Sequence, residues 1–330
     1  MGYQLTDSFG RTINNLRISV TDQCNFRCIY CMPEEGMIFH PKAEILTFEE
    51  IARISGIAAG LGINKLRLTG GEPTVRKDLP VLIRMLAELP GIDDIAMTTN
   101  GFLLKKMAKS LREAGLPRVN VSLDTLDAEK FERMTRRDVL DKVLEGLDEA
   151  EKYFELPIKI NVVAMRDYTD DDVLDFALLA RTRPYQIRFI EFMPLDADHT
   201  WSREKVLTGA EIIDRIHAVW PLDPVVRPNQ REPADLFRFR DGKGEIGLIA
   251  SVSEPFCENC NRIRITADGK LRTCLFSLWE TDLKTPLRSG ATDDLIASMI
   301  IEAVRNKEPG HHINDPTFVQ PERTMSAIGG

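Results

Sequence analysis

The amino-acid sequence predicts an α/β fold, a partial (β/α)6 TIM-like barrel followed by a C-terminal region of different character. Short β-rich runs alternate with amphipathic helical stretches from Asn14 to about Trp220, and this alternation is typical of parallel βα units. Six units fall short of the eight that close a TIM barrel, which indicates an open barrel. We therefore expect a barrel domain over residues 1–220 and a second region over residues 221–330.

Each strand of the predicted barrel is a short run rich in β-branched and apolar residues. The six runs cover residues 15–20, 65–69, 94–98, 118–123, 158–164 and 186–192. Helix-period segments lie between and after these runs. Two of them begin with capping-box spacings, Thr47 to Glu50 and Thr208 to Glu211, which predict helix N-termini.

Length and composition limit the classes of protein to which the chain can belong. With 330 residues, of which 43% are hydrophobic, it can bury a large core. There is no run of 18 apolar residues and no apolar signal segment at the start, so we expect no membrane association and a cytoplasmic location. The net charge of −8 argues against a nucleic-acid partner, so an anionic ligand would need a local cluster of cations.

The six cysteines form two triplets, Cys24-x3-Cys28-x2-Cys31 and Cys257-x2-Cys260-x13-Cys274. A structural zinc site or an ordinary iron–sulfur cluster takes four protein ligands. A cubane held by three cysteines leaves one iron open to an outside ligand. Zinc would need a fourth cysteine or a histidine, and no histidine lies within eight residues of a cysteine in the sequence. Disulfides would need an oxidising compartment, which nothing in the sequence indicates.

Several predicted strands carry a cation inside an apolar run. Arg17, Arg67, Lys159 and Arg188 have this setting, and the segment Arg262-Ile263-Arg264 repeats it. Because strand side chains alternate between faces, each cation points opposite to its apolar neighbours, into the barrel lumen. Internal salt bridges to Asp or Glu are one explanation, although inward acidic residues are few and Glu191 is the clearest. The other explanation is a polyanionic substrate such as a nucleoside triphosphate.

Polar residues also follow the ends of the predicted strands, where barrel enzymes place ligand-facing groups. In the turn Thr69-Gly-Gly-Glu-Pro73, Gly71 allows close approach of a ligand and Glu72 can receive a ligand ammonium, although a plain βα turn explains the same residues. Thr99, Asn100 and Asp124 are explained equally well as cap or turn residues. Met193 fits either the core or an apolar contact to adenine.

These motifs carry a family resemblance. The run Cys24-Asn-Phe-Arg-Cys28-Ile-Tyr30-Cys31 is similar to the signature of the radical S-adenosylmethionine enzymes. Over nearly the whole chain the sequence resembles the GTP 3′,8-cyclases, which begin molybdenum cofactor biosynthesis. The resemblance rests on both cysteine triplets, Arg67-Leu-Thr-Gly-Gly71-Glu-Pro, Thr98-Thr-Asn-Gly, Arg188-Phe-Ile-Glu-Phe-Met193, Cys260-Asn-Arg-Ile-Arg264 and the terminal Gly329-Gly330.

The resemblance implies two [4Fe–4S] clusters and S-adenosylmethionine as cofactors. Cys24, Cys28 and Cys31 would hold the cluster that cleaves S-adenosylmethionine, and Cys257, Cys260 and Cys274 a second cluster whose open iron faces the guanine of GTP. The residues implied to line the S-adenosylmethionine site are Tyr30, Gly71, Glu72, Ser122 and Met193. Those implied to bind GTP are Arg17, Arg67, Thr98, Lys159, Arg262, Ile263 and Arg264, with Arg262 and Arg264 also assisting catalysis.

The implied reaction is radical cyclisation. The 5′-deoxyadenosyl radical would take the ribose 3′ hydrogen of GTP, and the carbon radical would attack C8 of guanine to give 3′,8-cyclo-7,8-dihydroguanosine 5′-triphosphate. The Gly-Gly tail would reach toward the active site, although a frayed terminus is the ordinary fate of such an end. The resemblance further implies a low-potential electron donor and a downstream cyclic pyranopterin monophosphate synthase as partners, and it allows a homodimer.

Two other functions remain open at this level. A radical enzyme that modifies a peptide would use the second triplet as an auxiliary cluster, but it offers no reason for cations on the strands. A two-cluster electron carrier would need a fourth ligand for each cluster, whereas Met32 and Pro33 follow Cys31. The sequence leaves undecided whether Lys65 and Arg188 contact phosphate.

Overall fold

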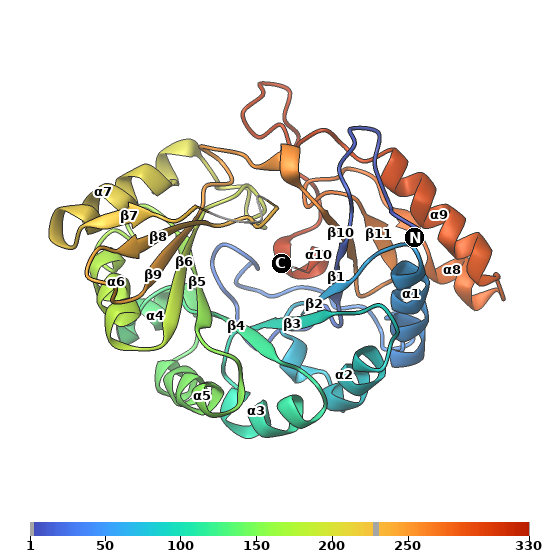
Figure 1. The fold of residues 1–330 in the computed structure, drawn as a ribbon, viewed down its shortest axis with the longest axis horizontal. Helices are drawn as coiled ribbons and strands as arrows, with labels where there is room; N and C mark the ends of the chain where they lie inside the picture. The colour runs from blue at the N-terminus through green and yellow to red at the C-terminus, as the bar shows by residue number, and fades with distance from the viewer. Residues whose placement is uncertain (1–2, 227–230, 330) are drawn as a thin grey trace.

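A twelve-stranded sheet dominates the computed structural model, which describes residues 3–226 and 231–329. The order of its strands is β12-β11-β10-β1-β2-β3-β4-β5-β6-β9-β8-β7, and the sheet curves into an open arc (Figure 1). The strands are β1 Asn15–Ser19, β2 Lys65–Thr69, β3 Asp94–Thr99, β4 Arg118–Ser122, β5 Ile158–Ala164, β6 Tyr185–Glu191, β7 Leu222–Pro224, β8 Asp235–Phe239, β9 Glu245–Ile249, β10 Arg262–Ile265, β11 Lys270–Arg272 and β12 Thr281–Asp282.

Helices cover the convex side of this arc (Figure 1). They are α1 Phe48–Gly60, α2 Leu79–Ala87, α3 Leu104–Glu113, α4 Ala128–Thr135, α5 Leu140–Tyr153, α6 Val173–Thr182, α7 Gly209–Val219, α8 Lys284–Arg288, α9 Asp293–Arg305 and α10 Met325–Ile328. Both predicted capping boxes are confirmed, because Thr47 and Thr208 each exchange hydrogen bonds with the glutamate three residues later. No helix among the described residues is long and apolar enough to cross a membrane.

The six predicted βα units are confirmed, and each observed strand boundary lies within one residue of the predicted one. Strands β1 to β6 are parallel and neighbour one another in chain order. The prediction was incomplete at both edges of the sheet, where β10 pairs with β1 and β9 pairs with β6, both in parallel. The C-terminal region therefore extends the barrel sheet at both edges, and the division at residue 220 stays a prediction.

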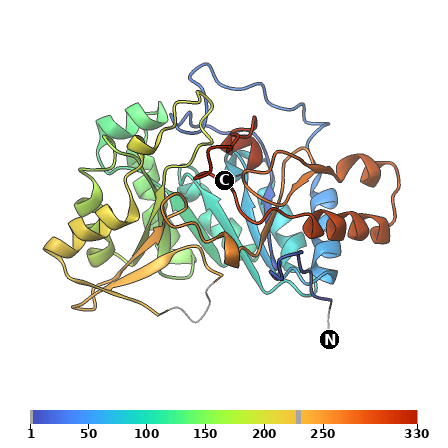
Figure 2. The same ribbon diagram turned by 90° about the horizontal axis from the view of Figure 1, so that it is seen from above.

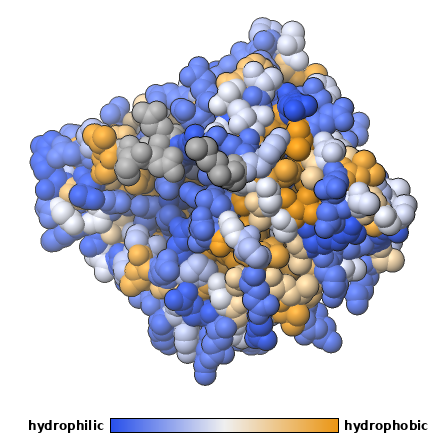
Figure 3. Space-filling model, turned by 45° about the vertical axis from the view of Figure 1, so that its right-hand side comes forward, coloured by the Kyte–Doolittle hydropathy of each residue, from blue (hydrophilic) through white to orange (hydrophobic). Residues whose placement is uncertain are grey.

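Alternation along the strands separates the core from the lumen. Leu16 and Ile18 on β1 are buried in the main hydrophobic cluster, whereas Arg17 between them faces the concave side. The outer helices have one apolar face each, as in α3, where Leu104, Ala108 and Leu111 are buried. Hydrophilic side chains cover most of the face in Figure 3, with apolar residues gathered in a few strips. The core thus lies between helices and sheet, and the concave side is left for polar groups.

The end of the chain returns to the middle of the arc. Figure 1 shows α10 and the C-terminus at the centre of the concave side, and Figure 2 shows the last segment crossing back over the strands. The last described residues, up to Gly329, therefore lie near the strand ends.

Candidate active site

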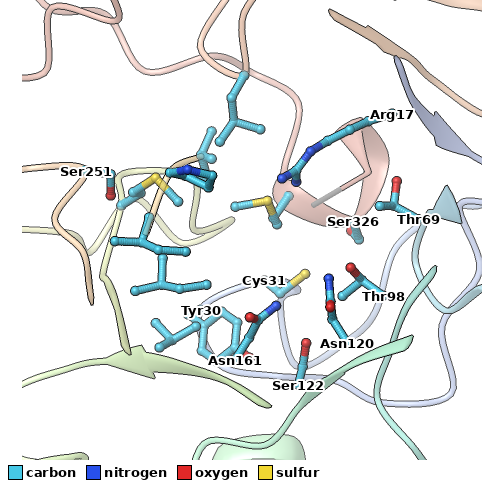
Figure 4. A pocket seen from close by; sticks show the side chains of 18 of the residues that line it. Arg17, Tyr30, Cys31, Thr69, Thr98, Asn120, Ser122, Asn161, Ser251 and Ser326 are labelled. Atoms are coloured by element: carbon cyan, nitrogen blue, oxygen red, sulfur yellow. The ribbon is translucent and has the colours of Figure 1, made fainter. Parts of the chain in front are cut away.

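Both cysteine triplets line one cavity on the concave side of the sheet. Its volume is about 340 Å³, and all six cysteines contribute to its wall. Figure 4 shows part of this wall, with Cys31 labelled. The N-terminal triplet lies in the loop after β1, where the backbone N–H groups of Cys31 and Met32 both donate to the carbonyl of Cys28. The C-terminal triplet lies before β10 and after β11. Residues separated by more than 200 positions therefore share one chamber.

The thiols fit clusters better than a single metal ion. All six cysteines are free, and no three Cys, His, Asp or Glu side chains among residues 3–226 and 231–329 converge on a site for one ion. In a cubane each thiolate binds a separate iron, so the thiols need not converge on a point. Two groups of three thiols in one cavity fit two clusters, each with an iron open toward the space between them.

The two triplets have different electrostatic surroundings. Burial raises the pKa of Cys24 to about 12 and that of Cys31 to about 11. Burial also opposes the charge of Cys260, yet Arg262 and Lys307 lower its pKa to about 6. The N-terminal thiolates therefore depend on a bound cation such as iron, whereas the protein itself supplies positive charge beside the C-terminal triplet.

Arg17 lies in the cavity wall, where it forms no ion pair with an Asp or Glu among residues 3–226 and 231–329. In register it lies beside Arg264 on β10 and Arg67 on β2. Burial, followed by the nearby Arg264, Arg262 and Arg67, lowers the pKa of Arg17. Its Nε has no hydrogen-bond partner within the described part of the chain. A buried guanidinium in this state favours an anionic ligand.

Arg67 forms an internal salt bridge, which was one of the two explanations that the sequence left open for the strand cations. Its guanidinium forms an ion pair with Asp94, and the same carboxylate also binds Arg118. Asp94 was not recognised as an inward acid because it is the first residue of its strand. Among the described residues, Arg67 lies outside the wall of the cavity, on the same sheet face as Arg17.

Lys159 and Arg188 form a second group of cations on the same face. Arg188 lines the cavity and its Nε donates to Gln186, 2.9 Å away. Lys159 lies two residues before Asn161, a cavity residue, and thus below the cavity wall. Burial, followed by Arg188 and Arg118, lowers the pKa of Lys159 to about 8. Lys65 is half-buried and does not reach the cavity wall described here.

The residues assigned to S-adenosylmethionine gather beside the first triplet. Tyr30, Gly71, Ser122 and Met193 all line the cavity, as does Thr98 from the GTP set; Figure 4 shows Tyr30, Ser122 and Thr98 around Cys31. The Tyr30 hydroxyl donates to Asp124 over 2.7 Å. A Cβ on residue 71 would come within 2.3 Å of the Gln23 carbonyl oxygen, so the close packing of this turn requires glycine.

Two of the predicted site residues, Glu72 in the cavity wall and Ile263 on β10, are almost completely buried. Glu72 is 1% exposed, and its carboxylate already accepts hydrogen bonds from Thr74, Thr99 and the backbone of Asn100. These bonds tie the Gly-Gly turn to the end of β3. The side chain of Ile263 is buried in the hydrophobic core, so the predicted contribution of this residue to GTP binding, which stays a prediction, would come from its backbone. Alternation along β10 places it opposite Arg262 and Arg264.

Some wall residues were missed by sequence reasoning. Asn120 on β4 and Asn161 on β5 line the cavity at alternating strand positions, as Figure 4 shows. A polar residue at every second position of an otherwise apolar strand is the signal that identifies such residues. Phe256, His311 and Ser326 also line the cavity, from loops and from α10; no periodic pattern marks these positions.

The tail enters the cavity between the strand ends. The carbonyl of Gly329 accepts a hydrogen bond of 2.7 Å from Arg264. Gly329 has φ +87°, and a Cβ there would come within 2.8 Å of both Ser19 and Thr69, so the position requires glycine. Gly330 lies outside the described residues. The tail thus contacts one of the cations assigned to substrate.

We expect Arg17→Met and Arg67→Met to behave differently. Loss of Arg17 should weaken GTP binding by about 1.5–3 kcal/mol, the range for hydrogen bonds to charged groups, and should leave the thermal midpoint unchanged or higher. Loss of Arg67 should lower stability by about 1–3 kcal/mol, because Asp94 loses a partner. Anaerobic melting and GTP binding of both reconstituted variants measure this. A destabilised Arg17→Met protein that binds GTP normally would contradict our interpretation of the lumen.

Comparison with known proteins agrees with this geometry. The sequence model of the Radical SAM superfamily matches residues 18–180, and that of Molybdenum Cofactor Synthesis C matches residues 185–313. The chain is 47% identical to the GTP 3′,8-cyclase of Pelotomaculum thermopropionicum, over 99% of this chain and 100% of that protein. It is 48% identical to that of Thermodesulfovibrio yellowstonii, with the same two coverages.

The solved structures support the fold. Streptococcus suis SuiB bound to S-adenosylmethionine matches with a TM-score of 0.61 at 15% identity, over 95% of this chain and 77% of that one. The partial barrel is therefore confirmed. The full-length similarity to the curated cyclases, together with the two cysteine triplets facing one cationic cavity, shows that this chain belongs to the GTP 3′,8-cyclase family of radical S-adenosylmethionine enzymes.

Proposed function

We propose that this protein cyclises GTP to 3′,8-cyclo-7,8-dihydroguanosine 5′-triphosphate in the cavity between the two cysteine triplets. The observation that carries the proposal is the shared wall, in which all six cysteines and the cations Arg17, Arg188, Arg262 and Arg264 face one space. A substrate held between two clusters would present its ribose to one of them and its base to the other. The product belongs to the first step of molybdenum cofactor biosynthesis.

The residues around the N-terminal cysteine triplet would bind and orient S-adenosylmethionine. Near Cys24, Cys28 and Cys31, the side chain of Tyr30 and the backbone at Gly71 would orient S-adenosylmethionine. With the clusters bound, one-electron cleavage of its sulfonium supplies the radical that takes the ribose 3′ hydrogen. A primary carbon radical attacks most groups within reach, so the walls must exclude water and hold one C–H bond in place.

The cations place the substrate. Arg17, Arg262 and Arg264 would bind the part of GTP between the clusters, since Arg17 has a buried donor without a partner. Lys159 and Arg188 lie on the same sheet face and would receive the triphosphate. Arg67, also on this face, pairs with Asp94 and would contribute less to GTP binding than Arg17. The lowered pKa of Lys159, caused first by burial and then by Arg188, leaves it partly neutral near pH 8 in the empty protein. A bound triphosphate would restore its charge, so GTP binding should be accompanied by proton uptake there.

The partners follow from this chemistry. Cleavage of S-adenosylmethionine needs a low-potential electron donor, and the cyclised triphosphate needs a cyclic pyranopterin monophosphate synthase to consume it. A cytoplasmic location suits clusters that oxygen destroys, and a homodimer is compatible with the cavity lying within one chain.

An anaerobic assay tests the function directly. The reconstituted protein is mixed with dithionite, S-adenosylmethionine and each nucleoside triphosphate in turn, and products are separated chromatographically. We expect 5′-deoxyadenosine and the cyclised product in equal amounts when GTP is the nucleotide, and no cyclised product with the other nucleoside triphosphates. Formation of 5′-deoxyadenosine that no nucleotide accelerates would contradict the assignment of substrate.

A further inference from the structure

Lys307 is a buried cation that the substrate assignment does not use. It follows α9 and is 3% exposed. Its Nζ donates to the carbonyl of Arg262, 3.1 Å away, and to the carbonyl of Thr273. In the described part of the chain, no Asp or Glu forms an ion pair with it. Burying an ammonium without a neighbouring negative charge costs several kcal/mol, so a counter-charge is expected.

The two carbonyls that this ammonium binds belong to residues beside the C-terminal cysteine triplet. Thr273 precedes Cys274, and Arg262 follows Cys260 by two residues. The two hydrogen bonds of Lys307 therefore join the backbone segments that carry Cys260 and Cys274, and they place its buried charge beside this triplet.

The neighbouring residues wrap the same triplet. A Cβ on Gly310 would lie 3.5 Å from the Cys257 sulfur. Arg11, itself paired with Asp7, donates to the carbonyls of Cys257 and Pro309 at 2.9 and 2.8 Å. Arg11 thus brings its own carboxylate partner, whereas Lys307 does not. Arg11 therefore has a structural role in holding these backbone segments together, whereas the charge of Lys307 is left for a negatively charged ligand.

We propose that Lys307 is the fixed counter-cation of the second iron–sulfur cluster, holding its ligand segments in place and favouring its reduced state. Three thiolates leave a bound cluster anionic, and one-electron reduction adds a further negative charge. A buried positive charge stabilises that added charge most where water is excluded. Lys307 is thus a positioning and tuning residue rather than one that touches GTP. The proposal rests on the C-terminal triplet holding a cluster.

The test isolates the second cluster and measures its potential. In the full chain carrying Cys24, Cys28 and Cys31→Ala, the cluster is titrated anaerobically and followed by electron paramagnetic resonance. Lys307→Gln removes the charge and keeps an N–H donor, and Lys307→Met removes both. We expect both variants to shift the reduced-to-oxidised ratio at fixed potential at least tenfold toward oxidised, about 59 mV for one electron. Lys307→Arg should keep the potential near that of the parent.

A substitution at Glu308 tests the effect of charge on the reduction potential in the opposite direction, because it removes a negative charge instead of a positive one. Glu308 lies next to Lys307, and its carboxylate accepts a 2.6 Å hydrogen bond from Thr273. Glu308→Gln removes a negative charge near Cys274 and should raise the potential. An unchanged potential in Lys307→Gln with full iron content would overturn the proposal. Should Lys307→Gln and Lys307→Met both lose the cluster, an unchanged potential in Glu308→Gln would overturn it instead. Parent protein without iron at this triplet would instead refute the cluster assignment on which the proposal rests.

Discussion

Replacing Cys24, Cys28 and Cys31 together by alanine is expected to abolish cleavage of S-adenosylmethionine completely. The parent protein should bind about eight irons per chain after anaerobic reconstitution and the variant about four, because each triplet holds one cubane. Burial raises the pKa of Cys24 to about 12 and that of Cys31 to about 11, so a bound cation such as iron would be needed to keep these thiols deprotonated. Iron analysis and chromatography of 5′-deoxyadenosine measure both effects.

Cys257→Ala, Cys260→Ala and Cys274→Ala, combined in one protein, serve as the matched control for that experiment. The control should also bind about four irons yet keep the ability to form 5′-deoxyadenosine. If the N-terminal variant still cleaved S-adenosylmethionine, the roles assigned to the two triplets would have to be exchanged.

The same control is expected to lose cyclisation of GTP entirely. Its remaining 5′-deoxyadenosine should form slowly and without coupling to product, because the N-terminal site is intact while the substrate has lost the cluster beside Arg262 and Arg264. Coupling is measured as the ratio of cyclised product to 5′-deoxyadenosine. Arg264→Met, which keeps both clusters, should lower this ratio less than removal of the whole triplet.

Normal cyclisation without the second cluster would overturn the assignment of that cluster to GTP. Arg264 also donates to the carbonyl of Gly329. Arg264→Lys keeps the positive charge, so it separates the loss of charge from the loss of the guanidinium. A tail that depends on this contact should become more accessible to carboxypeptidase in Arg264→Met than in the parent protein.

The sequence predicted the barrel strands because their signal is local. Each run of β-branched residues and each capping box depends on fewer than ten neighbouring residues, so Asn15–Ser19 or Thr47 can be placed without knowledge of the rest of the chain. The extension of the sheet by β9 and β10 could not be placed this way. It depends on pairing between residues near opposite ends of the chain, such as Leu16 with Ile263.

The site was also predicted only in part, because local sequence patterns do not show which distant residues come into contact. Alternation along the strands placed Arg17 in the lumen, whereas only the family resemblance implied that both cysteine triplets face the same substrate. Alternation did not distinguish Arg17 from Arg67, because the partner of Arg67 is Asp94 on the neighbouring strand. Ile263 was assigned with its motif rather than by its own face of the strand, and alternation alone places its side chain in the core.

The pairing of β10 with β1 has a consequence for biosynthesis. Strand β1 is the first strand to leave the ribosome. One of its two edges stays unpaired until β10, which begins at Arg262, has been synthesised. Until then, β1 is an exposed edge, which invites contacts with other chains, and long-range parallel pairing forms slowly. We therefore expect the nascent barrel to depend on chaperones, and the second cluster to be inserted only after synthesis of the chain is nearly complete.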